Sequence, residues 1–153
     1  MSMDIKNSVI AIARNAQAAS RQLSRVSSAA KNTALLQMAE ELLKNADRIL
    51  AENARDVSLA KKSAALSKAM LERLTLSKKT IAGMAQGMRE VAALPDPTGK
   101  VTSMWRRPNG LLVGRMRIPL GVIGIIYESR PNVTADAAAL CLKSGNAVIL
   151  RGG

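Results

Sequence analysis

The strongest constraint on the fold is a pair of short apolar runs that flank a helix-like segment. The runs are residues 118–127 and 147–150, and both are rich in Ile, Val and Leu. Apolar runs without polar alternation are typical of strands that are buried on both faces of a parallel sheet. The segment between them, residues 133–143, has apolar side chains at helical spacing, with Asn132 as its expected N-cap and Gly145 as its stop. The order predicts a strand–helix–strand unit that opens an α/β domain.

Residues 1–94 have a different pattern, which is the apolar periodicity of amphipathic helices. Ser28 and Ser77 stand just ahead of two apolar stripes and are predicted to be N-caps. Two prolines and a glycine within residues 94–99 (LPDPTG) prevent the last helix from continuing. We therefore expect a helical layer over residues 1–94.

Residues 95–118 are expected to form a linker and a two-stranded arm. Two strand-like segments stand on either side of Asn109-Gly110, a strong hairpin signal because both residues tolerate a positive φ. The arginines of the arm are expected on a face that meets solvent or a partner. The remaining residues, 119–153, belong to the α/β unit.

Composition excludes several kinds of chemistry. The chain has 153 residues, no histidine and one cysteine. Ser-His-Asp triads, histidine zinc sites, cysteine zinc clusters and internal disulfides are therefore excluded, and we expect no metal. A single cysteine favours a reducing, cytoplasmic location. We expect no membrane span, because no apolar stretch approaches about 20 residues. We expect no secretory signal, because the N-terminus has no positively charged leader followed by an apolar block.

The chain is strongly basic, with a formal net charge of +12. Such a charge permits a polyanionic partner, so a small basic interaction or nucleic-acid-binding module is the alternative interpretation. Against nucleic acid stands the scarcity of aromatic residues on which bases could stack, since the chain has only Trp105 and Tyr127. We expect no nucleic-acid partner. The simpler explanation of the charge is a solvated basic surface, or one that is covered by another part of a longer protein.

Polar residues follow each of the two expected strands, at residues 127–132 and 151–153. Ligands of open α/β sheets bind beyond the carboxyl ends of the strands, so these residues are the candidate site. Arg130 is suited to a phosphate, to an ion pair with Glu128 or to capping a carbonyl. Cys141 stands among Ala and Leu in the expected helix, where a cysteine behaves as a small apolar residue and not as a nucleophile.

Two long motifs carry a family resemblance. They are residues 118–134 (IPLGVIGIIYESRPNVT) and 137–153 (AAALCLKSGNAVILRGG), and the helical segments KNTALL, NARDV and MLERLTL follow the same pattern. Over essentially its whole length the chain resembles the N-terminal part of the gamma-glutamyl phosphate reductase family, also called glutamate-5-semialdehyde dehydrogenases, in the aldehyde dehydrogenase superfamily.

The resemblance implies NADPH-dependent reduction of L-glutamyl 5-phosphate to glutamate 5-semialdehyde and phosphate, in proline biosynthesis. The family's nucleophilic cysteine lies in a later motif that has no match here, so we assign no catalytic residue and expect this segment alone to be inactive. The implied fold is a helical layer, a β-arm and the first strand–helix–strand of an incomplete Rossmann-type, NADP-binding domain. The arm resembles the superfamily's oligomerisation arm, which implies a homo-oligomer of the full-length protein.

The resemblance also assigns roles to site residues. It implies that substrate, glutamyl phosphate, is bound by Ser129, Arg130 and Asn132, and that cofactor is bound by Tyr127, Glu128, Arg151 and Gly152. Arg151 stands where related dehydrogenases have a lysine at the adenosine ribose. A guanidinium there suits the 2′-phosphate of NADP.

Overall fold

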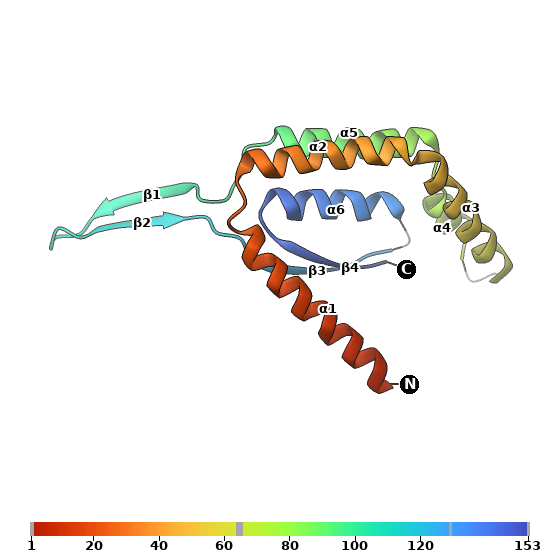
Figure 1. The fold of residues 1–153 in the computed structure, drawn as a ribbon, viewed down its shortest axis with the longest axis horizontal. Coiled ribbons are helices and arrows are strands. Elements are labelled where there is room, and N and C mark those ends of the chain that lie inside the picture. Colours follow the sequence, from red (N-terminus) through yellow and green to blue (C-terminus); the bar gives the residue numbers. More distant parts are fainter. Residues whose placement is uncertain (1, 64–65, 129, 153) are drawn as a thin grey trace.

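The computed structural model describes residues 2–63, 66–128 and 130–152 (Figure 1). The elements are α1 (Ser2–Leu23), α2 (Ser28–Lys44), α3 (Ala46–Ser63), α4 (Lys68–Leu74), α5 (Lys78–Ala93), β1 (Val101–Arg106), β2 (Leu112–Met116), β3 (Val122–Ile126), α6 (Pro131–Lys143) and β4 (Ala147–Arg151). None of the helices in this part of the chain combines the length and the apolar character that a membrane crossing needs.

The main body is built in layers (Figure 1). Helices α2 and α5 lie side by side and pack on α6, which in turn covers the β3–β4 sheet. The core between these helices is made of small and flexible apolar side chains: Leu35, Ala39, Met84, Ala85, Met88, Ala92, Ala135 and Ala139. Alanines at helix contacts allow the helix axes to approach closely, which compensates for the lack of aromatic side chains.

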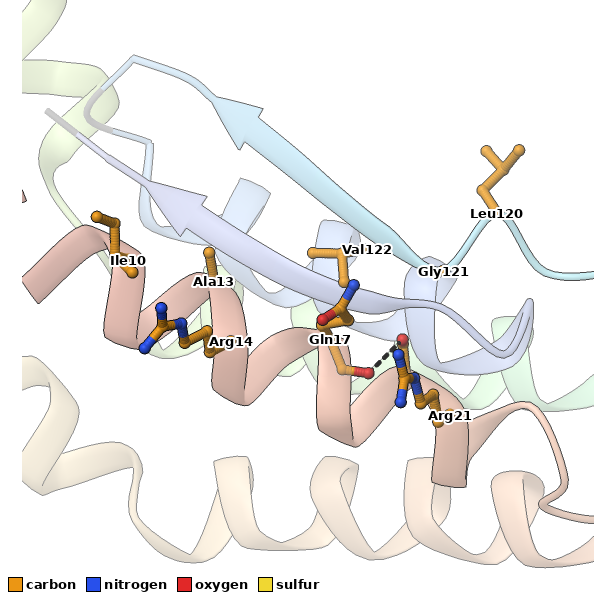
Figure 2. A pocket seen from close by; sticks show the side chains of 9 residues that line it. Ile10, Ala13, Arg14, Gln17, Arg21, Leu120, Gly121 and Val122 are labelled. Atoms are coloured by element: carbon orange, nitrogen blue, oxygen red, sulfur yellow. Dashed lines mark hydrogen bonds between the residues drawn. The ribbon is translucent and has the colours of Figure 1, made fainter.

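Helix α1 lies apart from that layer. It contacts β4 and β3 from the face of the sheet opposite α6, and its N-terminal half projects beyond the strands (Figures 1 and 2). Ile5, Val9 and Ile12 on this half are more than 50% exposed.

Strands β3 and β4 pair in parallel with α6 as the crossover, which confirms the predicted strand–helix–strand unit. The expectation that both strands are buried on both faces is wrong for this chain. Ile126 is 87% exposed, and no residue of β3 or β4 is fully buried. The reason is that a sheet of two strands has two open edges and covering helices that protect only part of each face.

Strands β1 and β2 form an antiparallel hairpin that projects from the body, as the sequence predicts (Figure 1). The turn differs in detail from the expected one. The Gly110 N–H donates to the Arg107 carbonyl at 2.9 Å, so Pro108 and Asn109 are the central residues of the turn. Gly110, with φ of 87°, follows them. Proline is favoured at the first central position because its φ is already fixed.

Two predicted helix caps are wrong by a residue or two. The cap of α2 is Ser27, whose Oγ accepts from the Ala30 N–H, and Ser28 is the first helical residue. Asn132 is the second residue of α6 and not its cap, because Pro131 takes the first helical position, where a missing N–H costs nothing. Ser77 caps α5 as predicted.

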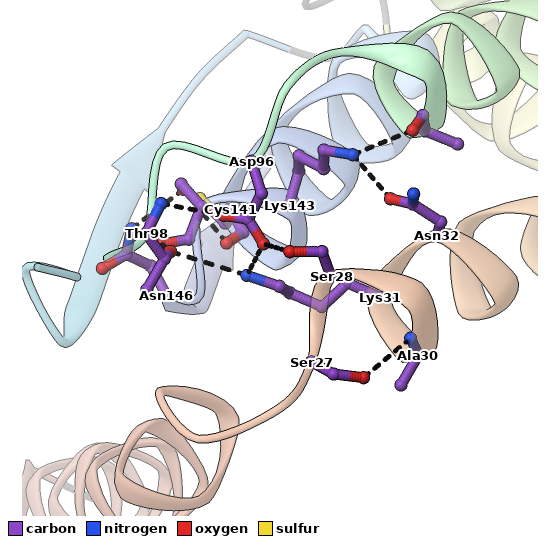
Figure 3. Close-up of polar contacts among 12 residues, drawn as sticks. Ser27, Ser28, Ala30, Lys31, Asn32, Asp96, Thr98, Cys141, Lys143 and Asn146 are labelled. Atoms are coloured by element: carbon purple, nitrogen blue, oxygen red, sulfur yellow. Dashed lines mark hydrogen bonds and ion pairs between the residues drawn. The ribbon is translucent and has the colours of Figure 1, made fainter. Parts of the chain in front are cut away.

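A polar network holds the linker after α5 against α2 and against the C-terminal end of α6 (Figure 3). The Lys31 ammonium, 1% exposed, forms an ion pair with Asp96. Burial raises the pKa of Asp96, but hydrogen bonds from Lys31, Ser28 and Thr98 outweigh it and hold that pKa well below its usual range. Thr98 in turn donates to the Ser144 carbonyl just after α6.

Three further hydrogen bonds fix the C-terminal end of α6 and the start of the sheet. The Lys143 ammonium donates to Asn32 and to the carbonyl of Ala92, which joins α6 to α2 and α5 (Figure 3). The Gly121 N–H donates to Asn146 Oδ1 at 2.9 Å, just ahead of β3. This hydrogen bond therefore fixes the start of β3 relative to the start of β4.

Candidate nucleotide and anion site

The carboxyl ends of β3 and β4 bring two segments of the candidate site together. The Tyr127 N–H donates to the Arg151 carbonyl at 3.1 Å, which extends the parallel ladder by one bond. A methyl group at Gly152 would lie 3.5 Å from the Tyr127 hydroxyl oxygen, so the ring and this glycine are in close contact. Tyr127, Arg151 and Gly152 therefore share one rim of the sheet, as the sequence predicts.

Two features leave this rim able to receive a ligand. The Arg151 side chain is exposed, and none of the ion pairs among the described residues involves it. The Tyr127 hydroxyl is hydrogen-bonded to Thr134 of α6, which fixes the ring beside Gly152. An exposed guanidinium at the carboxyl end of a parallel sheet is suited to a phosphorylated nucleotide.

Glu128 lies in a cluster of charge at the same rim. Its Oε2 accepts from Arg130 Nε at 3.2 Å and from Arg73 Nη1 of α4 at 3.0 Å. The ion pair of Arg130 with Glu128, one of the roles open to Arg130, is therefore formed. The carboxylate is 59% exposed, and the guanidiniums are 49% (Arg73) and 42% (Arg130) exposed, so the cluster faces water.

Sequence reasoning missed Arg73. It stands 55 residues before Glu128, and it becomes part of the site only because α4 lies beside the loop between β3 and α6 (Figure 1). The available signal was its place in the MLERLTL segment, which carries part of the family resemblance.

Two of the three residues predicted to bind substrate lie just before α6 or in its first turn. Asn132 is in the first turn of α6 and half-buried, and Arg130 precedes the helix without a side-chain hydrogen bond to its amides. Arg130 therefore directly precedes the positive end of the α6 dipole. Ser129 lies outside the described residues.

Cys141 is 5% exposed on the inner side of α6, and burial raises the pKa of its thiol. A raised pKa and a buried position are the opposite of what a nucleophilic thiolate requires. The interpretation of Cys141 as a small apolar residue agrees with this position.

A separate groove of about 600 Å³ lies between α1 and the start of β3 (Figure 2). Arg14, Gln17 and Arg21 line it from α1, and Gly121 and Val122 line it from the strand. It opens at the amino end of β3, so it is distinct from the rim that follows Ile126.

Comparisons with known proteins support the resemblance. No family model matches the chain. A gamma-glutamyl phosphate reductase of Geotalea daltonii is 64% identical over 151 residues, which are 99% of this chain and 36% of that protein. The reductase of Carboxydothermus hydrogenoformans is 59% identical over 95% of this chain and 35% of its own length.

Solved structures give the same result. The crystal structure of gamma-glutamyl phosphate reductase from Thermotoga maritima matches with a TM-score of 0.88 and 40% identity, over 92% of this chain and 34% of that one. The chain matches the N-terminal part of gamma-glutamyl phosphate reductases. The reductase from Saccharomyces cerevisiae matches with a TM-score of 0.84, also at 40% identity. The family resemblance is confirmed, and the chain spans about a third of the length of the reductases that it matches.

Proposed function

We propose that the chain forms the N-terminal part of an enzyme that reduces L-glutamyl 5-phosphate to glutamate 5-semialdehyde in proline biosynthesis. The observation that carries the proposal is the 64% identity to a gamma-glutamyl phosphate reductase over 99% of this chain. The alternative, a small basic interaction or nucleic-acid-binding module, has no support from the matched proteins.

We propose NADPH as the reductant, bound at the carboxyl rim of a Rossmann-type sheet that begins with β3 and β4. Tyr127, Arg151 and Gly152 would hold it. The fit rests on the exposed Arg151 guanidinium, which no carboxylate neutralises among the described residues, and on the absence of a side chain at Gly152. Bound NADPH supplies the hydride. In this chain the task of Arg151 is to attract and orient a 2′-phosphate, which would favour NADPH over NADH.

The proposed reaction also needs a nucleophile, and Cys141 does not supply it. Its thiol is buried within α6, away from the rim. The proposal therefore places the nucleophilic cysteine outside this chain, and residues 1–153 alone should not reduce glutamyl phosphate. We further propose a cytoplasmic enzyme, consistent with a single free cysteine. The exposed hairpin supports a homo-oligomer of the full-length protein.

Nucleotide binding to this chain tests the proposal. We expect NADPH to shift the backbone NMR signals around Tyr127, Arg151 and Gly152, with weaker binding of NADH. Arg151→Ala should reduce NADPH affinity about tenfold, because a charge-assisted contact to phosphate is lost. The matched control is Arg55→Ala, which removes an exposed, paired arginine of α3. Equal effects of the two variants, or equal affinity for NADPH and NADH, would contradict the proposed role of Arg151.

Activity gives a second test. The chain alone, mixed with glutamyl phosphate and NADPH, should cause no NADPH oxidation. Addition of the remaining two thirds of a gamma-glutamyl phosphate reductase as a separate polypeptide should restore it. NADPH oxidation by residues 1–153 alone would show that the nucleophile lies within this chain.

A further inference from the structure

Two arginines from distant parts of the chain converge on one oxygen atom at the rim. Arg73 comes from α4 and Arg130 from the residue before α6, and both donate to Glu128 Oε2. Each guanidinium uses one nitrogen for this contact, although a guanidinium has five N–H donors. The cluster therefore has donors to spare.

The charges in this cluster do not balance. Two guanidiniums face one carboxylate, which leaves an excess of one positive charge. The adjacent amino end of α6 adds to it, because no side chain caps its amides. A phosphoryl group with two negative charges and three oxygens would neutralise the pair of arginines better than a single carboxylate does.

The contact between Glu128 and the arginines is also easy to exchange. All three side chains are between 42% and 59% exposed, and ion pairs that face water add little to the stability of a fold. Water and ions reach the carboxylate freely. Asp96, by contrast, is only 10% exposed and is paired with the buried Lys31, so its carboxylate is shielded from water and ions.

We propose that Arg73 and Arg130 form a phosphoryl-binding pair in which the Glu128 carboxylate occupies the anion position until a ligand displaces it. This rests on the proposed function, since the ligands of that reaction carry phosphoryl groups, and it adds Arg73 as a binding residue. Glu128 then acts as an internal competitor for the site and not as a contact to cofactor.

The test measures the affinity of inorganic phosphate for the 153-residue chain by NMR titration, followed at the backbone amides of Arg73, Glu128 and Asn132. Arg73→Gln should weaken phosphate binding roughly fivefold to tenfold through loss of a charge-assisted contact. Glu128→Gln should strengthen it by a similar factor, because the competing charge is gone and the shape is kept. Opposite effects from two neighbouring substitutions do not arise from partial unfolding, which weakens binding in both variants.

The matched controls are Arg55→Gln and Glu52→Gln. These residues form an exposed ion pair on α3 with an Nη1–Oε1 distance of 2.8 Å, so the same changes in net charge are made away from the rim. Phosphate affinity that follows net charge alone, equally in the rim and control variants, would overturn the proposal. Unchanged affinity in Arg73→Gln and Glu128→Gln would also overturn it.

The source of the phosphoryl group is distinguished by adding NADPH. Phosphate that binds independently of NADPH points to the acyl phosphate of the substrate. Phosphate that NADPH displaces, with the displacement weakened in Arg73→Gln, points to a phosphate of the nucleotide. Failure of this inference leaves the proposed function testable, because the latter depends on NADPH binding through Arg151 and that contact is measured separately.

Discussion

Asp96 and Glu128 are both carboxylates held by cations, yet their surroundings differ. Asp96 is 10% exposed and is held by a lysine that is itself buried, with additional hydrogen bonds from Ser28 and Thr98. Glu128 is 59% exposed and has two exposed arginines as partners. A carboxylate–cation contact is fixed in the fold where water is excluded, whereas a contact that faces water stays open to exchange with water and ions.

The largest expected effect is that of Asp96→Asn. It leaves the Lys31 ammonium buried without an opposite charge, and such a loss costs about 3–5 kcal/mol. Urea unfolding followed by circular dichroism measures it. Asp47→Asn, which breaks an exposed pair with Lys78, is the control and should change the free energy of unfolding by less than about 1 kcal/mol. Equal losses in both variants would show that burial of the pair is irrelevant.

The contribution of Asp96 to the free energy of unfolding should also depend on pH. The pKa of Asp96 is lowered in the folded chain, so Asp96 contributes stability at pH values above its ordinary pKa of 3.8. That contribution is lost progressively as the pH falls below about 4 toward the lowered pKa, because the carboxylate of the unfolded chain then takes up a proton while that of the folded chain does not. Unfolding in urea at pH 7 and at pH 2.5 should show the difference between wild type and Asp96→Asn shrinking at the lower pH. A constant difference would contradict this.

Substitutions at two glycines with positive φ should cause losses of stability of intermediate size. Gly145, with φ of 74°, ends α6, and a Cβ there would lie 3.0 Å from Pro119 Cγ. Gly110 in the hairpin turn has φ of 87° but open space around it. Gly110→Ala should cost about 1 kcal/mol from backbone strain alone, and Gly145→Ala about 2 kcal/mol or more, because crowding is added. Thermal unfolding that ranks them in the reverse order would contradict this.

The smallest effect on stability is expected for Glu128→Gln. The cluster at the rim is exposed, so the free energy of unfolding should change by less than about 1 kcal/mol while phosphate affinity rises. Urea unfolding and the phosphate titration, carried out on the same sample, measure the two quantities. A large loss of stability would mean that Glu128 fixes the fold in the manner of Asp96.

The local features of this fold could be predicted from the sequence because they depend on neighbouring residues. The strand–helix–strand unit, the hairpin and the shared rim of Tyr127 and Arg151 all follow from apolar runs and turn residues. The predicted cap of α2 was wrong because Ser27 and Ser28 have the same chemistry, and only the backbone geometry distinguishes them. The prediction of Asn132 as the cap of α6 was wrong because Pro131, just before it, is the first residue of the helix.

Contacts between distant segments could not be predicted in this way. Arg73 meets Glu128 across 55 residues, and Ser28 meets Asp96 across 68. No periodicity or spacing encodes which helix lies beside which loop. The position of α1 against the sheet is of the same kind, since an amphipathic stripe does not specify its partner.

The hydrogen bond from Gly121 to Asn146 has a consequence for how the gene can vary. It fixes where β3 begins relative to β4, and side chains of a strand alternate between faces, so a slip of one residue would turn Arg151 to the wrong side. Insertions or deletions between Lys143 and Ala147 should therefore be eliminated by selection.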